Sequence, residues 1–440
     1  MSNHFAALIT RPIYTNAQVS HQGWGSSYRA PSSTAVAATA LQAGDLGSRA
    51  HPASALSPRR GVQARDRKET PRQPQPTQLF ASNRRAIQCG CPSTNGGPMP
   101  SLLSHVSAFE YWRLVGTPGF SAPEPCRANA PRNFDANDFE WFSGMGLLSY
   151  PLHGLTSTKH KNKDAITMRH LACPSLPHGS ICAISAQRLI ASPELTLLQI
   201  APLLSFAELV GIMCEFCGLF TIVGSDNTLV KRTPLTSVSK ISSFCERAKG
   251  LHGSSDCATA AQYALDRSRS PMETAAALIF TLPYYRGGYC LRGAELNRRI
   301  ALSAPVRKIA GVDTLEPDIF WRNHRTCLEY DSDAFHGDDS RIANDARRKN
   351  ALISSKIGVV TLTTAQLRSI RETQKIAHQL ALLMGGRIRI PNEDIFAMRH
   401  KLIRHDLLDG SSVLKSQYAL SQRAGQVIES PIANVGWGDE

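Results

Sequence analysis

Apolar and polar positions in the last third of the chain alternate in a pattern that predicts a mixed sheet flanked by helices. The apolar runs predict strands near 298–303 and over 317–321, 325–331 and 357–363, with helices over 271–282, 340–354 and 364–384. The polar run Arg322-Asn-His-Arg325 joins the two middle strands as a short turn. The sequence therefore predicts an α/β domain, which we bound at residues 256–390.

Composition divides the remainder of the chain into three further segments. Residues 1–98 are rich in Ser, Ala, Pro, Gln and Arg and show no helical or strand periodicity. They are expected to be either a disordered basic tail or the product of a start codon assigned too early, in which case Met99 is the biological start. Residues 99–255 begin with an amphipathic helix at Ser104 and are expected to form a mainly helical domain. A further helix and a polar tail are expected over 391–440.

Two acidic residues fall on the adjacent strands of the predicted hairpin. Asp318 follows Pro317 at the start of the first strand, and Glu329 lies in the second strand. Carboxylates that are forced together repel, and a fold tolerates them most easily when a cation lies between them. Oxygen ligands suit Mg²⁺ or Mn²⁺, which can organise a water molecule and a phosphate for hydrolysis. The sequence therefore predicts a metal-dependent nuclease site at these two residues.

The order of these residues resembles the active-site pattern of the PD-(D/E)xK restriction-endonuclease-like superfamily. The closer resemblance is to its branch of bacterial proteins similar to very-short-patch-repair endonucleases, and it covers roughly residues 270–385. The matching residues are Glu329-Tyr330-Asp331, His336, Asp345 with Arg348 and Leu352, and the strand that Gly358 begins. The resemblance implies a restriction-endonuclease-like mixed sheet flanked by helices, DNA as the substrate and Mg²⁺ or Mn²⁺ as the cofactor. Asp331 stands where the superfamily more often has Lys, and Ser332 where this branch prefers Gly.

Three further candidate site residues each have more than one interpretation. In the endonuclease interpretation, Asp331 completes the metal shell or orients the attacking water. His336 is then the general acid or base, because its titration range lies near neutrality; otherwise it is a turn histidine bonded to a neighbouring aspartate. Glu273 either joins the metal site, as a glutamate on the preceding helix often does in the superfamily, or only completes a capping box with Ser270.

The helix predicted over 340–354 separates apolar from basic positions. Ile342, Ala346 and Ile353 are expected to face the sheet. The basic residues expected to contact the DNA backbone are Arg341, Arg347, Arg348 and Lys349. The net charge of +14 is weak evidence for nucleic-acid binding by the predicted domains. More than half of the excess lies in residues 1–98, which hold eleven Lys or Arg and only three Asp or Glu.

A second class of function is a non-catalytic DNA-binding regulator. The helix that begins His105-Val-Ser-Ala resembles a short helix near the start of abortive-infection antitoxin proteins, which carry a small winged-helix-like segment. The alternative for this helix is an ordinary packing element. The two resemblances together suggest a role in phage defence or DNA repair. A third alternative for the function is an interaction protein in phage defence whose partner is another protein.

Cysteine content and hydropathy indicate a reducing, cytoplasmic setting without a membrane partner. The eleven Cys are scattered, and no signal peptide precedes them. No stretch of about twenty residues is uncharged and apolar enough to span a bilayer, since Glu208 and Glu215 interrupt the best one, 195–223. Cys214 and Cys217 have the spacing of a zinc half-site, but their apolar helical surroundings favour core thiols.

Overall fold

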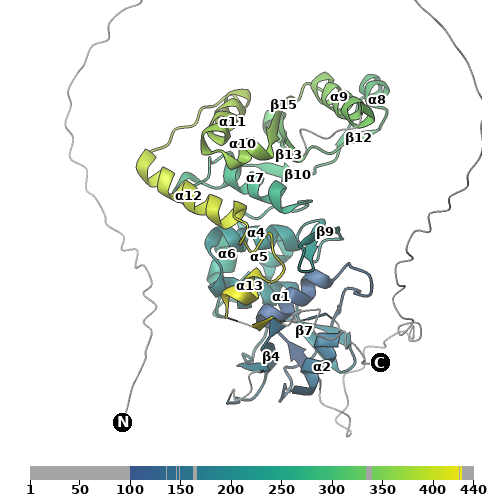
Figure 1. The fold of residues 1–440 in the computed structure, drawn as a ribbon, viewed down its shortest axis with the longest axis vertical. Coiled ribbons are helices and arrows are strands. Elements are labelled where there is room, and N and C mark those ends of the chain that lie inside the picture. Colours follow the sequence, from purple (N-terminus) through teal and green to yellow (C-terminus); the bar gives the residue numbers. More distant parts are fainter. Residues whose placement is uncertain are drawn as a thin grey trace, which may run out of the picture. The chain divides into compact units, whose positions relative to one another are not determined.

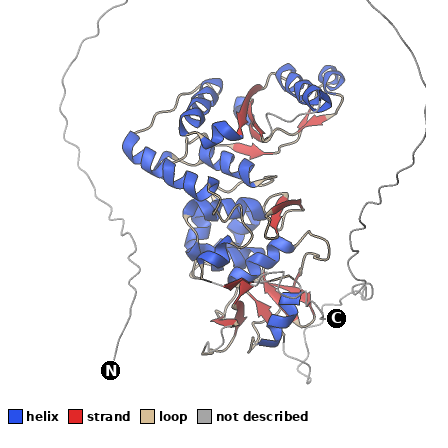
Figure 2. Ribbon diagram, viewed as in Figure 1, coloured by secondary structure: helices blue, strands red, loops and turns tan. Residues whose placement is uncertain are grey.

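The chain folds as an α/β protein with mixed sheets in the part that the computed structural model describes (Figure 1; Figure 2). The described residues are 100–134, 136–144, 146–147, 149–161, 166–332, 339–425 and 427–428. The predicted tail over 1–98 lies outside them. The α/β class predicted from the sequence is confirmed. Within the described ranges, none of the helices combines the length and the apolar character needed to cross a membrane.

The largest sheet lies near the start of the described chain and has six strands in the order β2-β6-β7-β1-β4-β5. The strands are β1 (Ser101–Leu103), β2 (Glu124–Pro125), β4 (Leu152–Thr156), β5 (Thr167–Leu171), β6 (Ile181–Ser185) and β7 (Arg188–Ala191). β1 runs parallel to β7 and antiparallel to β4, and β4 runs parallel to β5. The helices α1 (His105–Leu114) and α2 (Ala136–Gly144) and the short strand β3 (Ser149–Tyr150) lie between them in sequence.

The expectation of a mainly helical domain over 99–255 is wrong for residues 101–191, which form this sheet. Its strands are two to five residues long, so the apolar alternation that identifies a strand is hardly developed in the sequence. Helices do dominate from residue 193 to 261: α3 (Pro193–Ile200), α4 (Phe206–Phe216), α5 (Val238–Arg247) and α6 (Ser254–Ala261), with the hairpin β8 (Phe220–Val223) and β9 (Thr228–Lys231). A 3-10 turn, η1 (Ala201–Leu203), joins α3 to α4.

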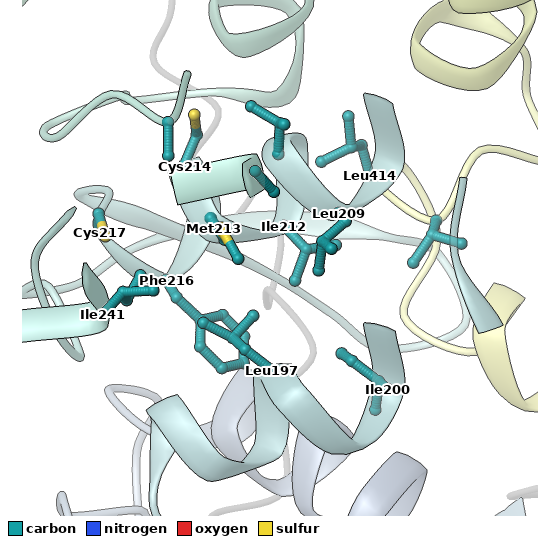
Figure 3. Close-up of a cluster of buried hydrophobic side chains, with 14 of the residues drawn as sticks. Leu197, Ile200, Leu209, Ile212, Met213, Cys214, Phe216, Cys217, Ile241 and Leu414 are labelled. Atoms are coloured by element: carbon teal, nitrogen blue, oxygen red, sulfur yellow. The ribbon is translucent and has the colours of Figure 1, made fainter. Parts of the chain in front are cut away.

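Helix α4 is the centre of the main hydrophobic core. Figure 3 shows its side chains packed between α3, α5 and a segment near the C-terminus that contributes Leu414. Cys214 and Cys217 are buried in this core, where burial raises the pKa of the Cys214 thiol to about 12 and that of Cys217 still higher. The interpretation of these cysteines as core thiols agrees with this environment, because a zinc ligand must be a thiolate.

The second sheet has four strands in the order β10-β13-β14-β15 and is the sheet predicted from the sequence. Its strands are β10 (Ala294–Leu296), β13 (Ile319–Trp321), β14 (Thr326–Asp331) and β15 (Gly358–Thr363). The first three are antiparallel, whereas β14 and β15 are parallel and connected by α9 (Asp339–Ser354). A 3-10 turn, η3 (Arg322–His324), forms the predicted turn of the hairpin. The strand expected near 298–303 is replaced by β10 and by a separate small pair, β11 (Ile300–Ala301) with β12 (Thr314–Leu315).

Helices cover both faces of this second sheet (Figure 1). One face packs on α9 and α8 (Ala304–Ala310), in a small core that includes Phe320, Cys327 and Leu352. The other face joins the main core through α7 (Pro271–Thr281), α10 (Thr364–Arg368) and α11 (Ile370–Leu383). The helix predicted over 364–384 is thus two helices, because Ser369 leaves helical geometry and caps α11.

The remaining elements connect the second sheet to the helical core. α12 (Glu393–Leu408) is the helix predicted after residue 391, and it packs on α7, α4 and the 3-10 turn η2 (Tyr284–Arg286). α13 (Ala419–Arg423) follows, and β16 (Val427–Ile428) pairs with β3.

Candidate active site

Asp318 and Glu329 lie side by side at the end of the predicted hairpin. Ile319 pairs with Leu328, so the next position outward sets Asp318 opposite Glu329, on the same face of the antiparallel pair. The backbone N–H of Tyr330 donates a hydrogen bond to Asp318 Oδ2 at 2.8 Å. The backbone N–H of Asn297 donates to the Asp318 carbonyl at 3.1 Å and ties this corner to β10. The structure therefore brings together the two acids that the sequence analysis paired.

Glu273 joins this acidic corner from the first turn of α7. Its backbone N–H donates to Ser270 Oγ at 3.1 Å, which is half of the predicted capping box. The other half is absent: Glu273 Oε2 accepts from the Arg269 backbone N–H at 2.9 Å and from Asn297 Nδ2 at 2.7 Å. The side chain of Glu273 is therefore directed toward Asn297 and the sheet rather than back to Ser270.

Burial raises the pKa of all three carboxyl groups, and the charge of Asp318 adds to this effect at Glu273 and Glu329. Burial and, to a smaller degree, the Asp318 carboxylate raise the pKa of Glu273 to about 7. Burial and then the charge of Asp318 raise the pKa of Glu329 to about 8, against the lowering effect of Arg348. Burial also raises the pKa of Asp318, although the Tyr330 N–H and Arg348 act in the opposite direction. Full ionisation of this site is therefore unfavourable without a compensating cation.

Arg348 supplies positive charge to the site from α9. Its Nη2 lies 3.0 Å from Glu329 Oε2 and donates to the Glu316 backbone carbonyl at 2.6 Å. Arg348 therefore lies against the acidic residues, because α9 is rotated relative to the predicted orientation. Its predicted contact with the DNA backbone is not tested. Ala351 and Leu352 are buried, whereas Ala346 and Ile353, which were expected to face the sheet, are exposed. Arg348 precedes Leu352 by four residues and so shares its face.

The other basic residues of α9 differ in their surroundings. Arg347 is exposed and donates to Asn344 Oδ1 at 2.9 Å. Lys349 is half-buried and near enough to lower the pKa of Glu329. Arg341 lies in α9, but its side chain is outside what the structure describes. Of the predicted basic surface, Arg347 alone is shown as an exposed cation among the described side chains.

The remaining candidate residues differ in whether the structure describes them. Asp331 is half-buried at the end of β14, two residues after Glu329 and hence on the same face of the strand. His336 lies outside the described residues, as does the side chain of Asp345. Neither of the alternative roles of His336 is therefore tested.

Two buried polar atoms at this site lack a hydrogen-bond partner. Among the described residues, Glu329 Oε1 and Asn297 Oδ1 are buried and have no hydrogen-bond partner. Such atoms are rare in folded proteins, and in a carboxylate site they suit a metal ion. The three acids do not form a closed cage, however, since the oxygens of all three do not gather within 4.8 Å. A cation would bind between Asp318 and Glu329 with Glu273 at its edge.

The contributions of Asn297 and Arg348 were not foreseen from the sequence. Asn297 follows β10 with a positive φ of 48°, a conformation that Asn tolerates better than most residues. Its side chain links Glu273 to the Arg267 carbonyl at 2.7 Å and 2.9 Å. The only signal in the sequence was the presence of an Asn directly after a short strand. That signal does not reveal that Asn297 bonds to Glu273 and Arg267.

Comparison with models of known protein families, with curated proteins and with solved structures found no match. The geometry of the site therefore carries the functional argument.

Thermal stabilisation by Mn²⁺ is expected to increase with pH. Glu273 and Glu329 have folded-state pKa values of about 7 and about 8, raised from 4.5. Without metal, the stability due to their protonated forms is complete below pH 4.5 and is lost as the pH rises through 7 to 8. A cation reverses this loss, because it binds the ionised form. The melting temperature should rise with Mn²⁺ far more at about pH 8.5 than at about pH 6.

The control for this measurement is Asp313→Asn, which alters an exposed aspartate paired only with Arg307 at 3.4 Å. This variant should behave as the unmodified chain does. The assignment of the metal to these acids would be contradicted if Mn²⁺ raised the melting temperature equally at the two pH values. It would also be contradicted if Mn²⁺ raised the melting temperature of Glu329→Gln as much as that of the unmodified chain.

Proposed function

We propose that this chain hydrolyses phosphodiester bonds in DNA with Mg²⁺ or Mn²⁺ bound at Asp318 and Glu329. The observation that carries the proposal is the position of these two buried carboxyl groups, with Asp318 just before β13 and opposite Glu329 of β14, near Glu273. Three interacting acids with raised pKa values are unfavourable for stability alone, and such clusters are typical of functional sites.

The order of elements supports a restriction-endonuclease-like fold for residues 270–385. The superfamily pattern is a strand with an acid, a spacer, Glu-x-Asp or Glu-x-Lys, a helix and a further strand. Here Asp318 directly precedes β13, Glu329 and Asp331 lie in β14, and α9 and β15 follow. Glu273 occupies the helix that precedes the sheet, as the superfamily glutamate often does. Five elements, α7, β13, β14, α9 and β15, and their acids thus occur in the required order.

The chain's own residues divide the chemical work as follows. Asp318 and Glu329 would hold the cation, which polarises the scissile phosphate and lowers the pKa of a bound water molecule. Glu273, with a pKa of about 7, is suited to accept a proton from water near neutral pH. Arg348 balances the charge of Glu329 and is placed to contact a phosphate oxygen when the cation takes over that role. Asp331 completes the shell or orients the water.

A non-catalytic DNA-binding regulator is the second candidate function. The salt bridge of 3.0 Å between Arg348 and Glu329 favours it, because a resident guanidinium compensates the carboxylate without any metal. Asp331 at the position of the superfamily lysine favours it as well. In that case the domain is a binding platform, and a protein partner in a defence system is compatible with it.

Plasmid conversion separates the two functions. The full chain is incubated with supercoiled plasmid and Mg²⁺ or Mn²⁺, beside Asp313→Ala as a matched carboxylate control. The nuclease function is supported if the unmodified chain and Asp313→Ala both convert the plasmid to its nicked or linear form and EDTA abolishes the conversion. Salt-sensitive binding without conversion in any metal would refute it and support the regulator.

A further inference from the structure

Three histidines from distant parts of the sequence meet at one edge of the six-stranded sheet. His105, His153 and His170 each offer one ring nitrogen, and these nitrogens all lie within 4.8 Å of one another. His170 Nε2 is 3.0 Å from His153 Nδ1. The ring of His105 stacks on that of His170 with 3.7 Å between the centroids. All three side chains are half-buried. This is the one such group of three or more metal-ligating side chains among the described residues.

Strand register explains how two of the three meet. His153 pairs with Met168 across the parallel strands β4 and β5, and His170 is two residues beyond Met168. Because side chains alternate along a strand, His153 and His170 project from the same face of the sheet. His105 is the first residue of α1, which directly follows β1, the other neighbour of β4. The start of α1 therefore lies beside the two strand histidines.

Hydrogen bonds fix the backbone around this cluster. The His153 carbonyl accepts from the Ser104 N–H at 2.8 Å, and its N–H donates to Ser107 Oγ at 3.0 Å. His153 is thereby bound on both sides to the first turn of α1. The N–H of His105 donates to Gln199 Oε1 at 2.9 Å. These contacts fix the backbone at His105 and His153 through α1 and α3.

His105 is held in an unfavourable backbone conformation. Its φ of 53° lies in the left-handed region, which residues other than Gly, Asn and Asp rarely adopt. Such a conformation is unfavourable and concentrates at functional sites. The preceding residue, Ser104, is buried, and its Oγ lies 2.9 Å from His105 Nδ1. The strain and the hydrogen bond together direct the ring of His105 over His170.

We propose that His105, His153 and His170 bind a zinc ion. Two nitrogens on a tetrahedral zinc lie about 3.3 Å apart, given Zn–N distances of about 2.0–2.1 Å. The 3.0 Å between His153 Nδ1 and His170 Nε2 is close to this separation. When His105 Nδ1–H donates to Ser104 Oγ, Nε2 of His105 carries the lone pair for the ion, which is the usual arrangement of a histidine ligand with an outer partner.

The chemistry of the cluster favours zinc over the hard cations. Imidazole suits Zn²⁺, whereas Mg²⁺ requires oxygen ligands. The ion takes the place of the hydrogen in the bond between His153 Nδ1 and His170 Nε2. The ring that carried this proton changes to its other neutral tautomer, because the proton passes through water to the far nitrogen of the same ring. Three protein ligands and partial exposure leave a fourth position for water.

Cobalt substitution in the full chain tests this site. The chain is stripped of metal by dialysis against a chelator, and Co²⁺ is then added to the wild type and to the variants His153→Gln and His170→Gln. His378→Gln, which changes an exposed histidine on α11, is the matched control. We expect intense visible absorption from one tetrahedral Co²⁺ per chain in the wild type and the control, and its loss on adding Zn²⁺. The carboxylate site on the second sheet would give only weak octahedral bands, so the two sites are distinguished.

The variants should bind Co²⁺ at least about 100-fold more weakly, because removal of an outer partner alone costs about 10–100-fold. Ser104→Ala keeps all three imidazoles and should weaken binding by about 10–100-fold. It preserves the test if a histidine variant does not fold. Absence of the tetrahedral spectrum in the wild type, or an unchanged spectrum in the folded histidine variants, would overturn the proposal.

Discussion

Substitution of Asp318 or Glu329 by alanine is expected to lower the rate of plasmid cleavage by about 1000-fold or more. Each change removes a ligand of the essential cation, whose charge stabilisation is worth several kcal/mol in the transition state. A loss of about 4 kcal/mol corresponds to about 1000-fold, since each 1.36 kcal/mol is a factor of ten. Binding of DNA should persist or tighten, because a negative charge near phosphate is removed.

Two further measurements make this prediction specific. Asp313→Ala should retain full activity, because Asp313 is exposed and remote from the three acids in the hydrogen-bonding pattern. Neither Asp318→Ala nor Glu329→Ala should unfold the chain at neutral pH, because both remove a buried carboxyl group whose pKa is raised. Cleavage that continues equally in both variants would place the activity elsewhere.

Substitution of Arg113 by methionine is expected to destabilise the chain by about 3–5 kcal/mol, the usual cost of leaving one charge of a buried pair alone. Arg113 and Glu215 are fully buried and joined by two hydrogen bonds of 2.9 Å and 2.6 Å. The guanidinium also donates to the Ser416 and Val413 carbonyls at 2.6 Å and 2.7 Å. It therefore ties α1 and α4 to the segment after α12, at the centre of the fold.

Urea denaturation measures this effect. Lys249→Ala, which breaks an exposed pair with Glu246, should change the free energy of unfolding by no more than about 0.5 kcal/mol. The double variant Arg113→Met with Glu215→Leu should regain much of the loss, because no charge is left unpaired. A loss below about 1 kcal/mol for Arg113→Met would show that water reaches this pair.

The candidate site was predictable where its residues are close in sequence. Asp318 and Glu329 flank a short polar turn, and an apolar run on each side sets the register that makes them neighbours. The helix-strand order from α7 to β15 also followed from periodicity. Glu273 was identified with two alternatives: its side chain contacts Asn297 and the Arg269 N–H rather than the Ser270 N–H, and its role in a metal site stays a prediction.

The orientation of α9 was not predictable from its apolar residues. Adjacent residues of a helix point in directions about 100° apart. Taking Ile353 rather than Leu352 as the buried residue therefore rotates the predicted buried face of α9 by about 100°. The sheet buries Leu352 and leaves Ile353 60% exposed. Arg348 consequently contacts Glu329 instead of solvent. Weighing Leu352 above Ile353 in the pattern would have found this contact.

The six-stranded sheet and the three-histidine cluster depend on contacts between distant residues. β1 pairs in parallel with β7 through Ser101 and Arg188, and such pairing leaves no local signal in strands of three or four residues. His105, His153 and His170 have no motif spacing, because three separate elements bring them together. Burial of α1 on nearly all sides likewise hides the amphipathic pattern expected for it.

The most direct test of the metal site is an anomalous difference map from crystals of the chain soaked in Mn²⁺. We expect a peak between Asp318 and Glu329, at about the 2.1 Å distance that oxygen ligands of Mg²⁺ adopt, with the Arg348 guanidinium displaced from Glu329. An empty map at these acids, with Arg348 still bonded to Glu329 at a saturating Mn²⁺ concentration, would contradict it.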